Sequence, residues 1–246
     1  MNKYLKSFGA ISLVLTATSV NAALIDLSTW TSEGNGTWYL AADNNSVTQT
    51  QNGNPTVFIN GEDSQGQQLS GQITVETTSD DDFIGFVLGY NAGDLTNSSA
   101  NYLLIDWKQS NQNYSGTTGE AGLAISQVTG AFSSLADFWG HTGVVTELAE
   151  ATMLGNTGWG DGVTYDFDLV FTSELVEVYV NDILELSATG TFSNGSFGFY
   201  NYSQSDVQYA SINQTTAVIP EPSTLAIFSV ALLGFAGYRR RFQQKG

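Results

Sequence analysis

Short apolar runs, many of them alternating with polar residues, recur from residue 71 to residue 202 and are separated by Gly, Asn, Ser and Asp. They are rich in Val, Ile, Tyr, Phe and Thr, which favour strands over helices. The runs that we expect to form strands are 71–77, 82–90, 101–109, 121–129, 165–171, 175–187 and 195–202. This pattern predicts an all-β protein.

Residues 175–187 form the clearest expected hairpin, because Asn181 and Asp182 supply a two-residue turn between two alternating runs. Only the segments 131–140 and 144–154 have helical character, and we expect both to lie outside the sheets. Many strands at even spacing over about 190 residues favour a two-sheet sandwich. No repeat of 20–50 residues is visible, which weighs against a propeller or a solenoid.

Both ends of the chain differ from this middle. Residues 1–22 begin with basic side chains, continue through an apolar stretch and end with small residues before an expected cleavage site. These are the three parts of a secretory signal peptide. Residues 223–238 are uncharged and precede three arginines. They predict a single transmembrane helix whose basic tail, residues 239–246, stays in the cytoplasm.

The C-terminal segment resembles the PEP-CTERM sorting signal of Gram-negative bacteria, because a Pro-Glu-Pro motif, an apolar helix and an arginine cluster follow one another. The residues of this signal are Pro220, Glu221, Pro222, Arg239, Arg240 and Arg241. The resemblance implies cleavage by an exosortase-type enzyme, in organisms that make extracellular polysaccharide and biofilm. Residues 215–222 are then a linker, and residues 23–214 are the domain delivered to the cell surface or beyond.

The balance of acidic and basic residues limits the classes of binding partner. Seven basic residues stand against 24 acidic ones, and Lys108 is the only lysine or arginine between residues 7 and 238. A phosphate backbone requires several basic contacts, so nucleic acid and anionic lipid are excluded. The chain contains no cysteine, which excludes disulfides and thiolate metal sites. Its many carboxylates instead favour divalent cations.

Three consecutive aspartates stand immediately before Phe83. A solvated acidic loop would explain them, but Phe83 must enter the core and therefore fixes the turn at a sheet edge. The sequence suggests no lysine or arginine near enough to neutralise the turn, so a bound cation would relieve the repulsion. We expect a structural Ca²⁺ site. Its expected ligands are Asp80, Asp81 and Asp82, with Asn91 or Asp106 as further candidates.

Several motifs follow the order of the thrombospondin C-terminal domain: DDDFIGFVLGYN, YLLIDWKQSNQNY, GEAGLAISQV, WGHTG and TGWGDGVTYDFDLVF. This resemblance covers most of residues 68–212 and implies a concanavalin-like, lectin-type jelly roll whose acidic turn is associated with calcium. In the family this domain follows calcium-loaded aspartate repeats and takes part in calcium-dependent adhesion. The chain lacks those repeats, so the resemblance implies the fold more directly than the adhesive role.

Other candidate groups carry weaker signals. His141 is the only histidine, which excludes a multi-histidine metal site, and we expect it to cap a turn. Asp166 and Asp168 share a strand face and could form a glycosidase pair, but the Glu-x-Asp-x-x-Glu pattern of related glucanases is missing. We expect most of the five tryptophans to be core residues. On an alternating strand one of Trp107 and Lys108 points outward, and the family motif implies that Trp107 is buried.

Together these features predict an exported, surface-sorted β-sandwich with structural calcium, acting in adhesion or in exopolysaccharide and biofilm association. Its expected partners are an exosortase-type enzyme and extracellular polysaccharide or surface proteins. One alternative is a lectin for the cell's own polysaccharide, which would stack sugar rings on exposed aromatic side chains. A secreted glycosidase is the other alternative, but we expect no enzyme.

Overall fold

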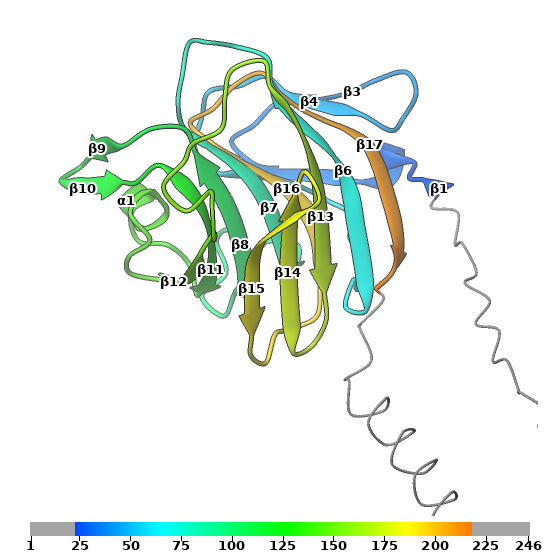
Figure 1. Cartoon of the computed structure of the whole chain (residues 1–246). Helices are drawn as coiled ribbons and strands as arrows, with labels where there is room; N and C mark the ends of the chain where they lie inside the picture. The colour runs from blue at the N-terminus through cyan, green and yellow to red at the C-terminus, as the bar shows by residue number, and fades with distance from the viewer. Residues whose placement is uncertain (1–22, 218–246) are drawn as a thin grey trace, which may run out of the picture.

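The computed structural model describes residues 23–217, which form a β-sandwich (Figure 1). The predicted signal peptide, sorting motif, transmembrane helix and basic tail lie outside the described residues. Within residues 23–217, no helix combines the length and the apolar character needed to cross a membrane. The predicted all-β fold is confirmed.

Two antiparallel sheets make up the sandwich. In spatial order, the first sheet, sheet A, contains β15 (Ile183–Thr189), β14 (Leu175–Val180), β13 (Thr164–Phe171), β6 (Gln67–Val75), β17 (Val207–Thr216), β4 (Val47–Gln49) and β3 (Trp38–Leu40). The second, sheet B, contains β12 (Val145–Glu150), β11 (Gly122–Thr129), β8 (Asn101–Lys108), β7 (Phe83–Tyr90), β16 (Ser196–Tyr202), β5 (Thr56–Ile59) and β2 (Thr31–Gly34). A short 3₁₀ helix, Leu27–Thr29, precedes β2.

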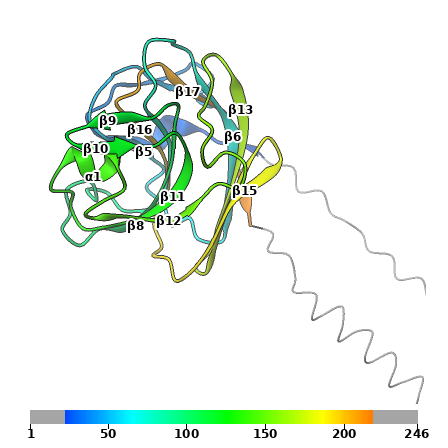
Figure 2. The same cartoon turned by 60° about the vertical axis from the view of Figure 1, so that its left-hand side comes forward.

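A third layer covers the outer face of sheet B. It contains the small hairpin of β9 (Gln112–Tyr114) and β10 (Thr117–Gly119), together with helix α1 (Leu135–Trp139). Figures 1 and 2 show these elements beside β8 and β11. We call this layer the cap. Sheet A has no such layer over its polar outer face in Figure 1.

The strand sequences reflect this asymmetry. Along β14 buried and half-buried residues alternate, as expected for a strand with one face on the core. All eight residues of β7 are buried, and so are seven of the eight in β8. One apolar cluster, which includes Phe86, Ile105 and Phe167, joins the two sheets, and a second, which includes Tyr102 and Phe138, joins sheet B to the cap. The centre of sheet B, at β7 and β8, is therefore buried on both faces.

Local signals were read correctly at the hairpin and at one helix. Asn181 and Asp182 connect β14 to β15 with φ angles of 50° and 64°, which confirms the predicted turn. Helix α1 lies inside the predicted segment 131–140 and is capped by Ser134, whose hydroxyl accepts from the Ala136 N–H.

The second predicted helix, 144–154, is wrong. Its first half forms β12, which pairs with β11 at the edge of sheet B. Glu, Leu and Ala favour helices only weakly, and pairing with a neighbouring strand outweighs that preference. Burial of Val145 against the cap favours the strand further.

The two ends of the described chain lie side by side. The first strand, β1 (Ala23–Leu24), pairs with β17 at Gln214 and Asn213. Strand β17 continues through Thr216, and the Ala217 N–H donates to the Gly66 carbonyl at 2.8 Å. The sandwich thus includes the first residues of the predicted linker 215–222.

Candidate functional site

The acidic turn lies at the start of β7, and the pairing of β7 with β8 determines what lies beside it. Phe83 is directly opposite Lys108 in the register of these antiparallel strands. The Lys108 side chain is 0% exposed, and its ammonium donates to the Asp82 carboxylate and, at 3.1 Å, to the Asp81 carbonyl. The prediction that no lysine or arginine lies near the turn is therefore wrong.

The cap closes over Lys108. Its Nζ lies 4.7 Å from the centre of the Trp139 ring and 5.2 Å from that of Phe83, so both aromatic faces contact the charge. Trp107 points the other way, into the core between the sheets, as predicted. The two side chains do lie on opposite faces of β8, but the cap keeps Lys108 from solvent as well.

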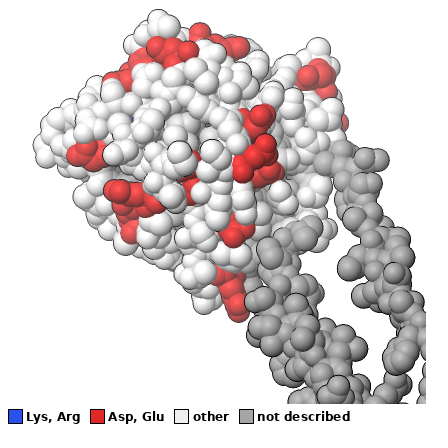
Figure 3. All heavy atoms as spheres, viewed as in Figure 1, with Lys and Arg blue, Asp and Glu red and all other residues white. Residues whose placement is uncertain are grey.

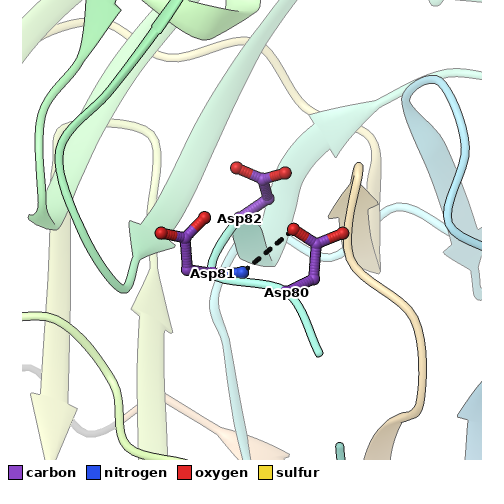
Figure 4. Close-up of side chains that lie close together, drawn as sticks. All are labelled: Asp80, Asp81 and Asp82. Atoms are coloured by element: carbon purple, nitrogen blue, oxygen red, sulfur yellow. Dashed lines mark hydrogen bonds between the residues drawn. The ribbon is translucent and has the colours of Figure 1, made fainter. Parts of the chain in front are cut away.

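The remaining oxygens of the turn are held by polar side chains. Asn52 donates to the Asp80 carboxylate, Ser110 donates to that of Asp81, and the Asp81 N–H donates to Asp80 Oδ1 at 3.1 Å (Figure 4). Burial raises the pKa of the Asp82 carboxyl, and the hydrogen bond and charge of Lys108 oppose that shift. The turn is thus ordered by side chains from two other segments, the loop at Asn52 and the end of β8.

The turn presents carboxylate oxygens of the kind that calcium binds. Asp80, Asp81 and Asp82 can each offer an oxygen within 4.8 Å of the others. Three carboxylates and the one ammonium of Lys108 leave two negative charges, which match one divalent cation. The residues present therefore fit calcium in charge and in chemistry.

The two further candidate ligands are not brought to the turn. Asn91 follows the opposite end of β7, where its backbone N–H donates to Asp94 Oδ2 at 2.9 Å. Asp106 lies on the covered face of β8, but its Oδ2 contacts His141 Nε2 at 3.0 Å. His141 Nδ1 lies 3.0 Å from Glu147 Oε2. The lone histidine therefore bridges two carboxylates.

Beside the turn lies a hollow of about 420 Å³, which we call the open hollow. Its lining includes Asn52, Asp80, Asp82, Tyr114, Trp139 and Tyr202. Tyr114 is 40% exposed, and its ring centre lies 5.2 Å from that of Trp139. Carboxylate and amide groups thus face an exposed aromatic ring.

A smaller hollow of about 90 Å³, the inner hollow, shares Trp139 with the open hollow. Its lining includes Asp106, Glu120, His141, Glu147 and Glu150. Acidic side chains also lie in several separate groups over the face of the molecule that Figure 3 shows.

The glycosidase pair lies on the other sheet. Asp166 and Asp168 share the outer face of β13, where Gln72 and Gln68 from β6 donate to them at 3.0 Å each. Burial raises the pKa of Asp168. Each carboxylate is thus engaged by a glutamine across the strand pair.

Sequence reasoning missed the role of Lys108, although a signal was present. Strand 82–90 begins at the acidic turn and strand 101–109 has Lys108 at its end, next to the last residue, so an antiparallel pair brings these ends together. Nothing in the sequence indicated Asn52, which comes from a loop far earlier in the chain. Tyr114 belongs to the β9–β10 hairpin, which carries no apolar pattern.

Solved structures with the same fold include carbohydrate-binding proteins. The carbohydrate-binding module CBM66 from Bacillus subtilis superposes with a TM-score of 0.55 and 13% identity, over 76% of this chain and 94% of the module. The exoplasmic/lumenal domain of VIP36 in its Ca²⁺/Man3GlcNAc-bound form superposes with a TM-score of 0.53 and 15% identity, over 82% of this chain and 91% of that domain. Both confirm a lectin-like sandwich.

Curated relatives are thrombospondins. Thrombospondin-2 of Gallus gallus is 25% identical over 193 residues, which are 71% of this chain and 16% of that protein. Thrombospondin-4-B of Danio rerio is 25% identical over 203 residues, which are 75% of this chain and 21% of that protein. The chain spans about a fifth of the length of these relatives.

Two family matches divide the chain where the sandwich ends. The thrombospondin C-terminal region matches residues 33–217, and the PEP-CTERM protein-sorting motif matches residues 218–241. Both resemblances seen in the sequence are confirmed, and the combination fits an exported protein. The chain belongs to the thrombospondin C-terminal region family and carries a PEP-CTERM sorting motif.

Proposed function

We propose that this protein is exported, processed at its sorting motif by an exosortase-type enzyme, and retained in the extracellular matrix by binding a saccharide in the open hollow. The observation that carries the proposal is the composition of that hollow. Asp80, Asn52 and Gln112 supply hydrogen-bonding groups for hydroxyls, and Tyr114 supplies an exposed ring face. A sugar ring has an apolar face, which can stack on the tyrosine ring, and hydroxyls at its edge, which can bond to the polar groups.

The size of the open hollow supports the same ligand class. At about 420 Å³ it lies within the range of about 300–1,000 Å³ that is typical of small-molecule sites. Among the described residues, the lining of the open hollow holds no basic side chain, and Lys108 is fully buried against Asp82. An anionic sugar therefore finds no exposed positive side chain there, which favours neutral sugars over uronic acids.

A binding experiment tests the proposal. Neutral oligosaccharides from the host's own polysaccharide are titrated into the protein, and Tyr114→Ala and Asn52→Ala should each weaken binding at least about tenfold, or about 1.4 kcal/mol. Tyr39→Ala is the matched control, because Tyr39 is 61% exposed on β3 and does not line the hollow. Equal binding by wild type and all three variants would show that the open hollow is not the binding site. Release of reducing sugar would instead indicate a glycosidase, which we do not expect.

Calcium at the acidic turn belongs to the same proposal, because an ordered turn fixes the wall of the open hollow. A ligand that binds only the folded state stabilises it by about 2.7 kcal/mol at a hundredfold excess over Kd. The variant Asp80→Asn/Asp81→Asn should lose most of this stabilisation, while Asp82 remains to pair with Lys108. The control Asp166→Asn/Asp168→Asn removes the same charge from sheet A. An equal calcium response in both variants at matched ionic strength would count against the site.

Sorting is tested separately. Changing Pro220, Glu221 and Pro222 to alanine should leave uncut precursor in the inner membrane. Equal amounts of mature protein outside the cell in both strains would contradict exosortase processing.

A further inference from the structure

Asparagine is followed by glycine at four places in the chain, residues 35–36, 52–53, 60–61 and 194–195. In such a pair the backbone nitrogen of the glycine can approach the asparagine side chain closely, because glycine has no Cβ to hinder it. Asn35, Asn52 and Asn194 are exposed, and Asn60 is half-buried. Sequence and exposure alone therefore do not separate Asn194 from Asn35 and Asn52.

The contacts of the side-chain oxygen do separate them. The Gly195 N–H donates to Asn194 Oδ1 at 2.9 Å, and the Gln65 N–H donates to the same oxygen at 3.0 Å. The glycine nitrogen thus lies against the side-chain amide that precedes it. The second N–H polarises the amide carbonyl and is placed to stabilise negative charge on its oxygen, as in an oxyanion hole.

The backbone around Gly195 holds this contact in place. Gly195 has a φ angle of 154°, and a Cβ there would lie 2.6 Å from the carbonyl carbon of Gly89, so the position requires glycine. Its carbonyl accepts from the Ser64 N–H at 2.9 Å. Two successive residues, Ser64 and Gln65, therefore fix the two reacting groups relative to each other. Such fixed proximity is what accelerates an intramolecular reaction.

The other three asparagines direct this oxygen elsewhere. Asn52 Oδ1 accepts from the Ser203 hydroxyl at 3.4 Å. Asn35 Oδ1 accepts from Gln51 Nε2 at 2.7 Å. Asn60 Oδ1 accepts at 3.2 Å from the backbone N–H two residues later in the chain. The contact between a side-chain oxygen and the N–H of the following glycine is therefore particular to residue 194 among the four pairs.

We propose that Asn194 is a site of spontaneous modification, at which the side-chain amide is converted to a carboxylate without an enzyme. The Gly195 amide nitrogen gives its proton to solvent base, and its electron pair forms a bond to Asn194 Cγ. The carbonyl pair moves onto Oδ1, beside the Gln65 N–H, and then returns as the Cγ–Nδ2 bond breaks. The nitrogen leaves as ammonia, with a proton taken from water, and a five-membered cyclic imide remains.

Water then opens the imide at either of its two carbonyls. Cleavage of the bond from Gly195 N to Cγ leaves aspartate at position 194, whereas cleavage of the bond from this nitrogen to the backbone carbonyl carbon leaves isoaspartate. Isoaspartate lengthens the main chain by one atom directly before β16, whose first residue, Ser196, is paired with Tyr90 of β7. The modification therefore adds a negative charge and, in the isoaspartate form, weakens the start of β16.

The four pairs allow an internally controlled experiment. The full chain is kept in mildly alkaline buffer, folded or in urea, and peptide mapping by mass spectrometry follows imide and isoaspartate at each asparagine. In the folded protein Asn194 should react at least about tenfold faster than Asn35 and Asn52, which corresponds to about 1.4 kcal/mol in barrier height. In urea the four sites should react at similar rates, because the fixed contacts are gone.

The variant Asn194→Gln assigns the fast event. Its longer side chain keeps the amide but places the carbonyl carbon one bond further from the Gly195 nitrogen, so the fast event should disappear while the other three rates stay unchanged. The proposal is overturned if Asn194 reacts no faster than Asn35 and Asn52 in the folded protein. It is also overturned if Asn194 is just as far ahead in urea, because sequence alone would then account for its rate.

Discussion

Charged side chains on the outer faces of the two sheets have different kinds of partner. On sheet A, Asp166 and Asp168 point toward solvent and pair with neutral glutamines of β6. On sheet B, Asp106 and Lys108 likewise share the outer face of their strand, β8, but the cap covers them. Each of these two has a partner of opposite charge, His141 or Asp82.

The difference shows how a covering layer changes the requirements for a charged side chain on a strand. Water solvates a lone carboxylate on an open face at little cost, whereas the same group under a cap requires an internal partner. Both basic side chains that the described chain places under the cap, Lys108 and His141, are used in this way. The open face relies instead on neutral hydrogen bonds.

The largest expected effect comes from Lys108→Met. This change leaves Asp82 buried beside two aromatic rings without its partner, and we expect a loss of about 3–5 kcal/mol in the free energy of unfolding. Urea denaturation measures it. Adding Asp82→Asn to the variant should recover part of the loss, because the unpaired charge is then gone. A loss below about 1 kcal/mol would show that the cap does not isolate this pair from water.

His141 should make stability depend on pH. Its folded pKa of about 10 lies above the unfolded value of about 6.5, so the native state holds the proton more tightly. Its stabilisation is complete below about pH 6.5 and is lost as the pH rises through 10. Between pH 6 and pH 10 we expect wild type to lose about 1.5–3 kcal/mol more than His141→Asn.

Asparagine suits this comparison because it tolerates the φ angle of 47° at residue 141. The measurement is urea denaturation in chelator across the pH range. Ionisation of the tyrosines affects both proteins equally, so only the difference between them is informative. Parallel pH profiles would mean that the two carboxylates do not hold the proton.

A smaller effect is expected at the exposed end of sheet A. Asp182 has a φ angle of 64°, which glycine adopts without steric conflict. We expect Asp182→Gly to raise the free energy of unfolding by about 0.5 kcal/mol and Asp182→Val to lower it by about 1–2 kcal/mol. Thermal unfolding of both variants measures the difference. If valine were tolerated as well as glycine, the turn would not depend on its backbone conformation.

The smallest effect should come from Gln72→Ala on the open face. It removes the hydrogen bond to Asp166, but water can replace the lost donor. We expect a change within about 0.5 kcal/mol, as for most surface positions. A loss comparable to that of Lys108→Met in the same urea assay would remove the contrast between the two faces.

The fold was largely predictable, because strand signals are local. Alternation and turn residues indicated β6, β13 and the β14–β15 hairpin, and each is present. Segment 144–154 was misread because its helix-forming residues pair with β11, a contact made across the sheet. The hairpin of the cap was also missed, since β9 and β10 have almost no apolar residues to indicate them.

The site was predictable only in part. The sequence draws attention to the acidic turn, because three adjacent carboxylates before a buried strand are visible in sequence alone, and the structure brings their oxygens together. Its neutralisation by Lys108 depends on register, and its contact with Asn52 depends on the path of a distant loop. The bridge from Asp106 through His141 to Glu147 depends on the cap folding back over β8.

Strand β17 also determines how a force applied at the C-terminal end of the domain is transmitted to the sheets. It lies inside sheet A and pairs with β6 over Val207–Thr216 and with β4 over Val207–Tyr209. A strand flanked on both sides must break two rows of hydrogen bonds before it detaches, so tension is shared by the sheet. Figures 1 and 2 place the cap on the side away from the end of β17. A domain anchored through this strand is therefore held by the interior of sheet A, on the side away from the cap.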